Sequence, residues 1–172
     1  MCAHGTRDDD ASDQGCAIRL RPAIDDDREF LFALYCTTRA DELDGWGWAP
    51  AQRDAFLKMQ FDAQARSYRA QYPAADHSII LREEHPVGRL FVARADGELR
   101  LVDIALMDDY QRLGIGGSLI RELMQRASSE NLILRLSVLA SNAAAIRLYE
   151  RLGLRRTGGD QLYSSFEWKP AE

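Results

Sequence analysis

Three glycines occur within four positions, at Gly114, Gly116 and Gly117, between a predicted strand and a strongly periodic helix. Because glycine has no Cβ atom, a ligand can approach the main chain closely along such a run. The N-terminus of the following helix adds unpaired N–H groups and a partial positive charge, which suit a pyrophosphate. The run has neither the lysine of a Walker motif nor the G-x-G-x-x-G spacing of a dinucleotide fold. The sequence therefore predicts another kind of anion-binding turn, and a plain flexible turn is the alternative for an isolated run.

The periodicity of apolar residues on both sides of this turn predicts an α/β chain (an α+β mixed sheet) with helices packed on the sheet faces. The predicted strands are 17–21, 77–82, 87–95, 99–107, 132–139, 154–157 and 162–168. The predicted helices are 25–38, 50–72, 114–128 and 142–152, and Gly153 ends the last one. The order is β-α-α-β-β-β-α-β-α-β-β. Residues 1–15 are expected to form a flexible polar tail, and residues 16–172 are expected to form a single domain.

Charge and composition exclude several classes of function. The 172-residue chain has a formal net charge of −5, whereas a nucleic-acid partner requires a basic surface. No segment approaches the roughly 18 consecutive apolar residues of a membrane span, and the acidic N-terminal residues do not resemble a secretion signal. No metal-ligand spacing occurs among the cysteines and histidines, which are Cys2, Cys16, Cys36, His4, His77 and His85. We therefore expect a cytoplasmic protein with reduced thiols and no metal, nucleic-acid or membrane partner.

Two motifs are similar to those of the GCN5-related N-acetyltransferase (GNAT) family. Residues 109–116, Asp-Tyr-Gln-Arg-Leu-Gly-Ile-Gly, match the family pattern Q/R-x-x-G-x-G/A. Residues 140–154 resemble the pattern N-x-x-A-x-x-L-Y-x-x-x-G-F, with Leu154 in place of phenylalanine. This second segment closely resembles that of ribosomal-protein N-terminal alanine acetyltransferases. The resemblance implies a GNAT-like fold in which the strands 99–107 and 132–139 splay apart.

The resemblance also implies that acetyl-CoA is the co-substrate and that no metal is needed. Its pantetheine arm is expected to enter between the splayed strands and to pair with main-chain groups of Ile104, Ala105 and Leu106. Its pyrophosphate is expected in the loop formed by Gln111, Arg112, Leu113, Gly114, Ile115, Gly116, Gly117 and Ser118. For Ser118, an ordinary place in the first helical turn is an equal alternative. In this family the first two helices usually form the acceptor wall, although most of their aromatic residues are expected in the core.

Asn142 and Tyr149 lie at positions i and i+7 of the last predicted helix and therefore share one face. Asn142 is a candidate cofactor ligand, and a helix N-cap is the alternative. The resemblance makes Tyr149 both a cofactor contact and the proton donor to the CoA thiolate. A phenol with an ordinary pKa of about 10 is protonated at neutral pH, as that role requires. The alternative for Tyr149 is a half-buried aromatic whose hydroxyl satisfies a backbone group.

At the position of the general base, this sequence differs from the enzymes that it resembles. A glutamate serves as the base in ribosomal-protein acetyltransferases, and Ser137 stands at the aligned position here. Asp103 is the candidate substitute, because a carboxylate in an otherwise apolar strand is costly unless it is paired. An arginine partner is the more common explanation for such a residue, and a catalytic role is the alternative. Weaker candidates are His77, Glu83 and Glu84, and a water chain without a dedicated base is a further alternative.

These features together predict an enzyme, an acetyl-CoA-dependent N-acetyltransferase. Its expected acceptor is a primary amine of a small molecule or a peptide, and the sequence does not choose between them. A non-catalytic acyl-CoA-binding sensor or scaffold domain is the alternative, because the glycine-rich loop serves both functions. Whether the chain forms a homodimer is left open.

Overall fold

The computed structural model describes residues 17–39 and 47–170. Within them the strands are β1 (Ile18–Pro22), β2 (Asp76–Arg82), β3 (His85–Ala95), β4 (Glu98–Leu106), β5 (Ile133–Leu139), β6 (Arg155–Gly159) and β7 (Tyr163–Trp168). The helices are α1 (Arg28–Thr37), α3 (Pro50–Gln71), α4 (Ile115–Ser129) and α5 (Ala143–Arg151), with 3-10 turns η1 (Asp25–Asp27) and η3 (Asp108–Tyr110). The predicted order of strands and helices is confirmed. The predicted tail, residues 1–15, lies outside the described residues.

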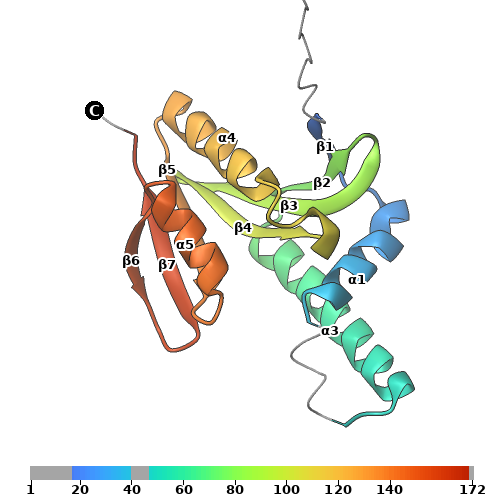
Figure 1. The fold of residues 1–172 in the computed structure, drawn as a ribbon. Helices are drawn as coiled ribbons and strands as arrows, with labels where there is room; N and C mark the ends of the chain where they lie inside the picture. The colour runs from blue at the N-terminus through green and yellow to red at the C-terminus, as the bar shows by residue number, and fades with distance from the viewer. Residues whose placement is uncertain (1–16, 40–46, 171–172) are drawn as a thin grey trace, which may run out of the picture.

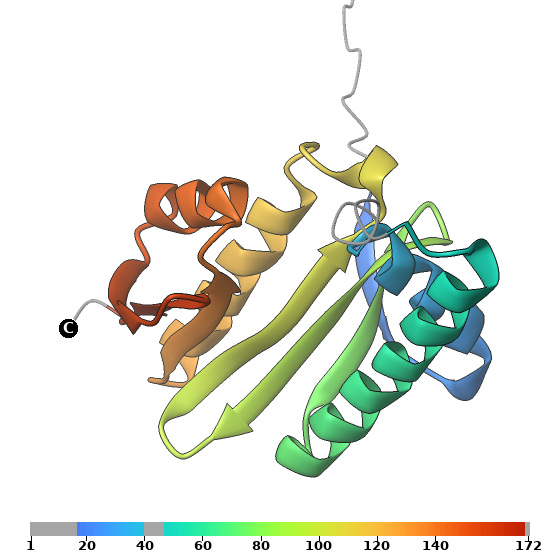
Figure 2. The same cartoon turned by 90° about the horizontal axis from the view of Figure 1, so that it is seen from below.

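The strands of this described part form one mixed sheet in the order β1-β2-β3-β4-β5-β7-β6. The β4–β5 pair is parallel, and the other neighbouring pairs are antiparallel. A parallel pair needs a crossover connection, and the segment that contains α4 provides it. Helices α4 and α5 lie on one face of the sheet, whereas α1 and α3 lie on the opposite face (Figures 1 and 2).

Two apolar clusters hold the helices on the sheet. In the first cluster, Leu119 and Leu123 of α4 are buried against strand residues such as Leu134. Their i, i+4 spacing places both side chains on the face of α4 that meets the sheet. In the second cluster, Phe61 of α3 is buried together with Ile79 of β2. The sheet therefore has a packed layer on each side where helices cover it.

The central strands β4 and β5 separate partway along their length. Their pairing extends from Glu98 with Ile133 to Leu101 with Leu136 and ends there, although both strands continue. Beyond this point β4 runs toward η3 and β5 stays beside β7 (Figure 1). The predicted splay of the central strands is therefore confirmed.

A β-bulge lies at the point of separation. On the other side of β4, Val92 pairs with Leu101 and Phe91 pairs with Asp103, so Val102 is an extra residue. An extra residue in one strand reverses the alternation of its side chains. As a result Asp103 faces the α1–α3 side of the sheet, opposite to the side on which Leu101 packs against α4.

In the described parts of the chain, no helix is both long and apolar enough to cross a bilayer.

Candidate active site

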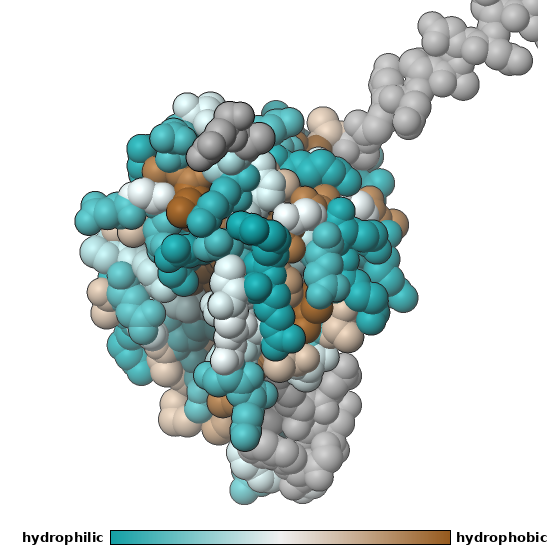
Figure 3. Space-filling model, turned by 90° about the vertical axis from the view of Figure 1, so that its left-hand side faces the viewer, coloured by the Kyte–Doolittle hydropathy of each residue, from teal (hydrophilic) through white to brown (hydrophobic). Residues whose placement is uncertain are grey.

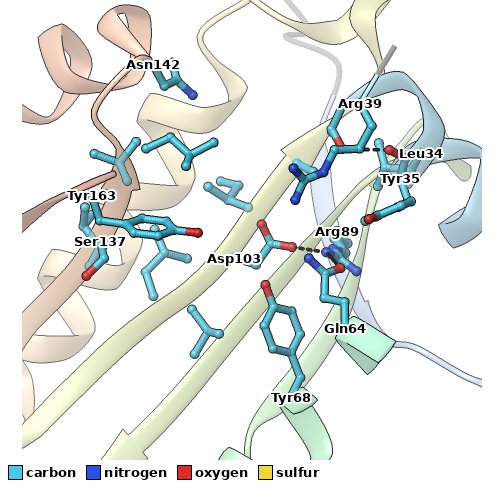
Figure 4. Close-up of a pocket in the computed structure, with 18 of the residues that line it drawn as sticks. Leu34, Tyr35, Arg39, Gln64, Tyr68, Arg89, Asp103, Ser137, Asn142 and Tyr163 are labelled. Carbon is cyan, nitrogen blue, oxygen red and sulfur yellow. Dashed lines mark hydrogen bonds and ion pairs between the residues drawn. The ribbon is translucent and has the colours of Figure 1, made fainter. Parts of the chain in front are cut away.

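A cavity of about 310 Å³ lies where β4 and β5 separate. Its walls come from the two separated strands, from α1 and α3 on one side, and from β7 and α5 on the other. Figure 4 shows its side chains converging from these elements. Polar groups project into the cavity from opposite walls, with Asp103 on β4 and Tyr163 on β7 facing one another across the opening (Figure 4). The cavity therefore brings together residues that are far apart in the sequence.

Tyr149, the candidate proton donor, lines this cavity from α5. Only 6% of the residue is exposed, and its ring packs against Phe166 with ring centroids 5.8 Å apart. Burial and, to a smaller extent, the nearby negative charge of Asp103 raise the pKa of Tyr149 to about 12. The phenol is thus protonated throughout the neutral range, which is the state that a proton donor needs.

Asp103, the candidate base, also lines the cavity and is paired with Arg89 of β3. Arg89 is buried, and its Nη2 atom donates a hydrogen bond of 2.8 Å to Oε1 of Gln64 on α3. The same guanidinium lies 5.8 Å from the centre of the Tyr68 ring. An arginine partner for Asp103 was the common explanation for such a carboxylate, and the structure identifies that arginine. The pair lies at the cavity wall, and the carboxylate of Asp103 faces the cavity (Figure 4).

Several residues of the cavity wall were not singled out as site residues from the sequence. Gln64 and Tyr68 reach it from α3, Tyr35 from α1 and Tyr163 from β7. Burial, together with the charge of Asp103, raises the pKa of Tyr68 to about 12, so this phenol is also protonated at neutral pH. The aromatic residues of the two helices were a signal for an acceptor wall, but their helical spacing did not separate Tyr68 from core residues such as Phe61.

The glycine-rich loop forms the start of α4, as predicted. Gly114 has a φ of +83° and precedes the first helical residue, so a residue with a side chain would be strained there. Gly116 differs, because a Cβ atom built on it meets no atom within 4 Å. Neither packing nor backbone conformation therefore requires glycine at this position, although glycine weakens a helix relative to alanine. Space left open beside main-chain N–H groups at a helix N-terminus fits an anionic ligand.

The other loop residues have local roles. The side chain of Gln111 donates hydrogen bonds of 3.0 Å to the carbonyl oxygen of Leu106 and to Asp108, which fixes the loop to the end of β4. Ile115 is buried in the core, so that only its main chain is available to a ligand. Leu113 and Ser118 are exposed. Arg112 has a φ of +60° and is exposed on the loop.

The separated edge of β4 contains two of the three residues expected to pair with the pantetheine arm. Ile104 and Ala105 line the cavity and pair with β3 on their other side, beyond the last residue that pairs with β5. A strand edge without a neighbouring strand can pair with an extended ligand through main-chain groups. Leu106 is not part of the cavity wall, and its carbonyl accepts the hydrogen bond from Gln111.

Asn142 and Ser137 lie on the β5–α5 side of the cavity. The side-chain oxygen of Asn142 accepts a hydrogen bond of 3.0 Å from the main-chain nitrogen of Ala145, so the N-cap that was the alternative role for this residue is present. The same residue lines the cavity, and the two roles are compatible. Ser137 stands where the resemblance places a glutamate, and its hydroxyl lies 3.5 Å from that of Ser165.

Other residues considered from the sequence do not reach this cavity. Glu83 and Glu84 form the turn between β2 and β3, and Glu84 pairs with Arg19. His77 shares the sheet face of Asp103 but lines a separate space behind Tyr68 and Arg89. Desolvation lowers the pKa of His77. Among the residues that the structure describes, no group of three or more histidine, cysteine, aspartate or glutamate side chains is arranged to hold a metal ion.

The fold and the cavity define a GNAT-type α/β domain. The model of the "Acetyltransferase (GNAT) family" matches residues 36–154, and the chain belongs to this family.

Individual relatives match either a short segment closely or most of the fold distantly. The [ribosomal protein bS18]-alanine N-acetyltransferase of Escherichia coli strain K12 is 47% identical over 57 residues, which are 33% of this chain and 38% of the relative. The crystal structure of the corresponding S18-alanine enzyme from E. coli has a TM-score of 0.63 and 19% identity, covering 91% of this chain and 96% of that one. The PaiA N-acetyltransferase of Thermoplasma acidophilum, in complex with coenzyme A, has a TM-score of 0.66 and 16% identity, covering 89% and 99%.

Proposed function

We propose that the protein is an N-acetyltransferase that moves the acetyl group of acetyl-CoA to a primary amine of a peptide or a small molecule. The observation that carries the proposal is the placement of Tyr149 and Asp103 on one cavity at the separated edge of β4. A protonated phenol can act as the general acid, and a carboxylate as the general base, that acyl transfer to an amine requires. Family membership and the coenzyme A complex of the Thermoplasma relative support the choice of co-substrate.

In the proposed reaction the neutral amine attacks the thioester carbonyl carbon, and the carbon–sulfur bond breaks. Tyr149 donates its phenolic proton to the leaving thiolate, which is released as the thiol of CoA. Asp103 accepts, directly or through a water molecule, the proton that the ammonium form of the acceptor loses to become this neutral amine. The second proton, which is lost as the amide forms, restores the phenol of Tyr149. Asp103 is the proposed acceptor because it is the only carboxylate that lines the cavity in the described part of the chain.

The open space at Gly116 and the unpaired edge of β4 support a binding mode for acetyl-CoA. The N-terminus of α4 would hold the pyrophosphate, and Ile104 and Ala105 would pair with the pantetheine arm. Asn142 would complete this side of the cavity. The thioester would then lie between Tyr149 and Asp103, with the acceptor entering from the α1–α3 side of the sheet.

The test is a thiol-release assay with acetyl-CoA and a panel of peptides and small amines, with mass spectrometry of each product. We expect at least one amine to gain an acetyl group at a rate that saturates with acetyl-CoA. The alternative function, a non-catalytic acyl-CoA sensor, would give acetyl-CoA binding without thiol release for any amine. That result would contradict the proposal.

A further inference from the structure

The strands β5, β7 and β6 have one open face beside the proposed active site. Along β5 the even-numbered residues Leu134, Leu136 and Val138 are buried, whereas Arg135 and Ser137 on the other face are partly or fully exposed. Figure 3 views the molecule from the side of β6 and β7 and shows many hydrophilic side chains on that side. The open face therefore offers polar groups to a molecule that extends beyond the cavity.

One row of charged residues crosses this face from strand to strand. Arg100 of β4 pairs in register with Arg135 of β5, Arg135 with Glu167 of β7, and Glu167 with Arg155 of β6. Glu98 accepts hydrogen bonds of 3.0 Å from Arg100 and 2.9 Å from Arg135. These contacts fix the guanidinium groups at one level of the sheet.

The row carries more positive than negative charge. Glu167 lies 3.8 Å from Arg135, 3.8 Å from Arg155 and 3.4 Å from Lys169. Together with their neighbours Glu98 and Lys169, the described residues of this row comprise two carboxylates and four cations. The local excess is positive although the whole chain has a net charge of −5. A guanidinium has five N–H donors, so that Arg100 with one carboxylate partner and Arg135 with two both keep further donors available.

A groove runs along this row and borders the cavity. It has a volume of about 290 Å³, its charged lining residues are Arg100, Arg135 and Glu167, and it shares Leu136 and Ser137 with the wall of the cavity. Strand residues rise by about 3.3 Å each, so the level of Arg135 lies about 7 Å from that of Ser137. An extended peptide covers this distance with about two residues.

We propose that the groove binds acidic side chains of the acceptor, which is a peptide whose free α-amine is followed by glutamate or aspartate within its second to fourth residues. This inference rests on the proposed acetyltransferase function and names its substrate class. Arg100 and Arg135 contact the acidic side chain of the acceptor, while the α-amine lies in the cavity near Asp103. An α-amine, with a pKa near 8, is also far more often neutral at pH 7 than a lysine side chain.

The test compares two peptides that differ only at residues 2–4, with glutamate in one and glutamine in the other, and that contain no lysine. At saturating acetyl-CoA and low ionic strength, we expect kcat/KM to be roughly tenfold higher for the glutamate peptide, mainly through KM. Raising the salt concentration should reduce this ratio, because exposed charges are screened. The salt series uses the unmodified protein and so does not depend on the folding of a variant.

Variants test which residues produce the ratio. Arg135→Gln should bring the ratio close to one, and Arg135→Lys should retain most of it. Arg66→Gln, which removes an exposed arginine of α3 outside the groove, is the matched control and should leave the ratio unchanged. Thermal midpoints of all variants show whether the sheet remains folded.

The outcomes separate this inference from the function on which it rests. Equal rates with both peptides would overturn the acidic-acceptor inference and leave the acetyltransferase function intact. A preference that persists in both Arg135→Gln and Arg100→Gln would also overturn it. If neither peptide nor any small amine is acetylated, the proposed function fails and the inference fails with it.

Discussion

Arg89 and Asp103 form an ion pair across neighbouring strands at the wall of the cavity. They are diagonal neighbours on one sheet face, since Asp103 pairs in register with Phe91 and Arg89 with Ala105. The arginine is buried and the carboxylate is 23% exposed on its side chain. Asp103 therefore has a structural partner and also a free approach from the cavity, so a structural role and a proton-accepting role must be separated by experiment.

The first prediction separates these two roles of Asp103. Asp103→Asn removes the proposed proton acceptor, so activity should fall at neutral pH and recover as rising pH supplies more neutral amine. Arg89→Met breaks the same ion pair but keeps the carboxylate. Its loss of activity should therefore not be repaired by alkaline pH. The measurements are pH–rate profiles and thermal midpoints of both variants.

Both variants should melt at a lower temperature than the unmodified protein, because each leaves one buried or half-buried charge without its partner. Parallel pH–rate profiles for the two variants would show that Asp103 acts only through the ion pair. A proton acceptor reached through water would then have to be sought elsewhere in the cavity.

The second prediction concerns the glycine-rich loop at the start of α4, where the pyrophosphate of acetyl-CoA is proposed to bind. Acetyl-CoA should stabilise the protein by about 2.7 kcal/mol at 100 times its dissociation constant. Gly116→Val should abolish this stabilisation by acetyl-CoA, because the valine side chain would fill the space that the pyrophosphate needs. The fold should tolerate the change, since a Cβ atom there meets no atom within 4 Å. Gly158→Val on β6, where a Cβ atom also meets nothing, is the control. Unchanged CoA affinity in Gly116→Val would refute the proposal that the pyrophosphate binds at this loop.

The third prediction concerns stability at acid pH. Hydrogen bonds from Arg21 at 2.7 Å, followed by that from the main-chain N–H of Ile24, lower the pKa of the buried Asp27 carboxyl. A lowered pKa in the folded state stabilises the protein above the unfolded pKa of about 3.9. This contribution is lost as the pH falls through the folded value.

Asp27→Asn should accordingly reduce the free energy of unfolding by about 2 kcal/mol at pH 7, the scale of hydrogen bonds to a charged group. The difference from the unmodified protein should shrink as the pH is lowered below about 4. Asp26→Asn changes an exposed neighbour and serves as the control. Denaturant unfolding across the pH range checks both variants, and a constant difference at all pH values would contradict the assignment.

Sequence reasoning located the strands and helices because their apolar periodicities are strong, as in α4, where Leu119 and Leu123 are buried as expected. It did not identify Arg89 as the partner of Asp103, because that contact depends on the register of β3 and β4. It also could not detect the bulge at Val102, which decides the face on which Asp103 lies. Tyr163 was missed because a single tyrosine at the start of a strand carries no signal of its own.

The central claim is that Tyr149 protonates the CoA thiolate in a catalytic cycle, and Tyr149→Phe tests it most directly. The change keeps the ring against Phe166 and removes only the hydroxyl, so acetyl-CoA affinity should change little. With a pKa of about 12 the phenol stays protonated through neutral and mildly alkaline pH. The measurement is turnover on an accepted amine together with the dissociation constant of acetyl-CoA. We expect turnover to fall roughly 10²–10⁴-fold at unchanged affinity. Full turnover in the variant would contradict the account.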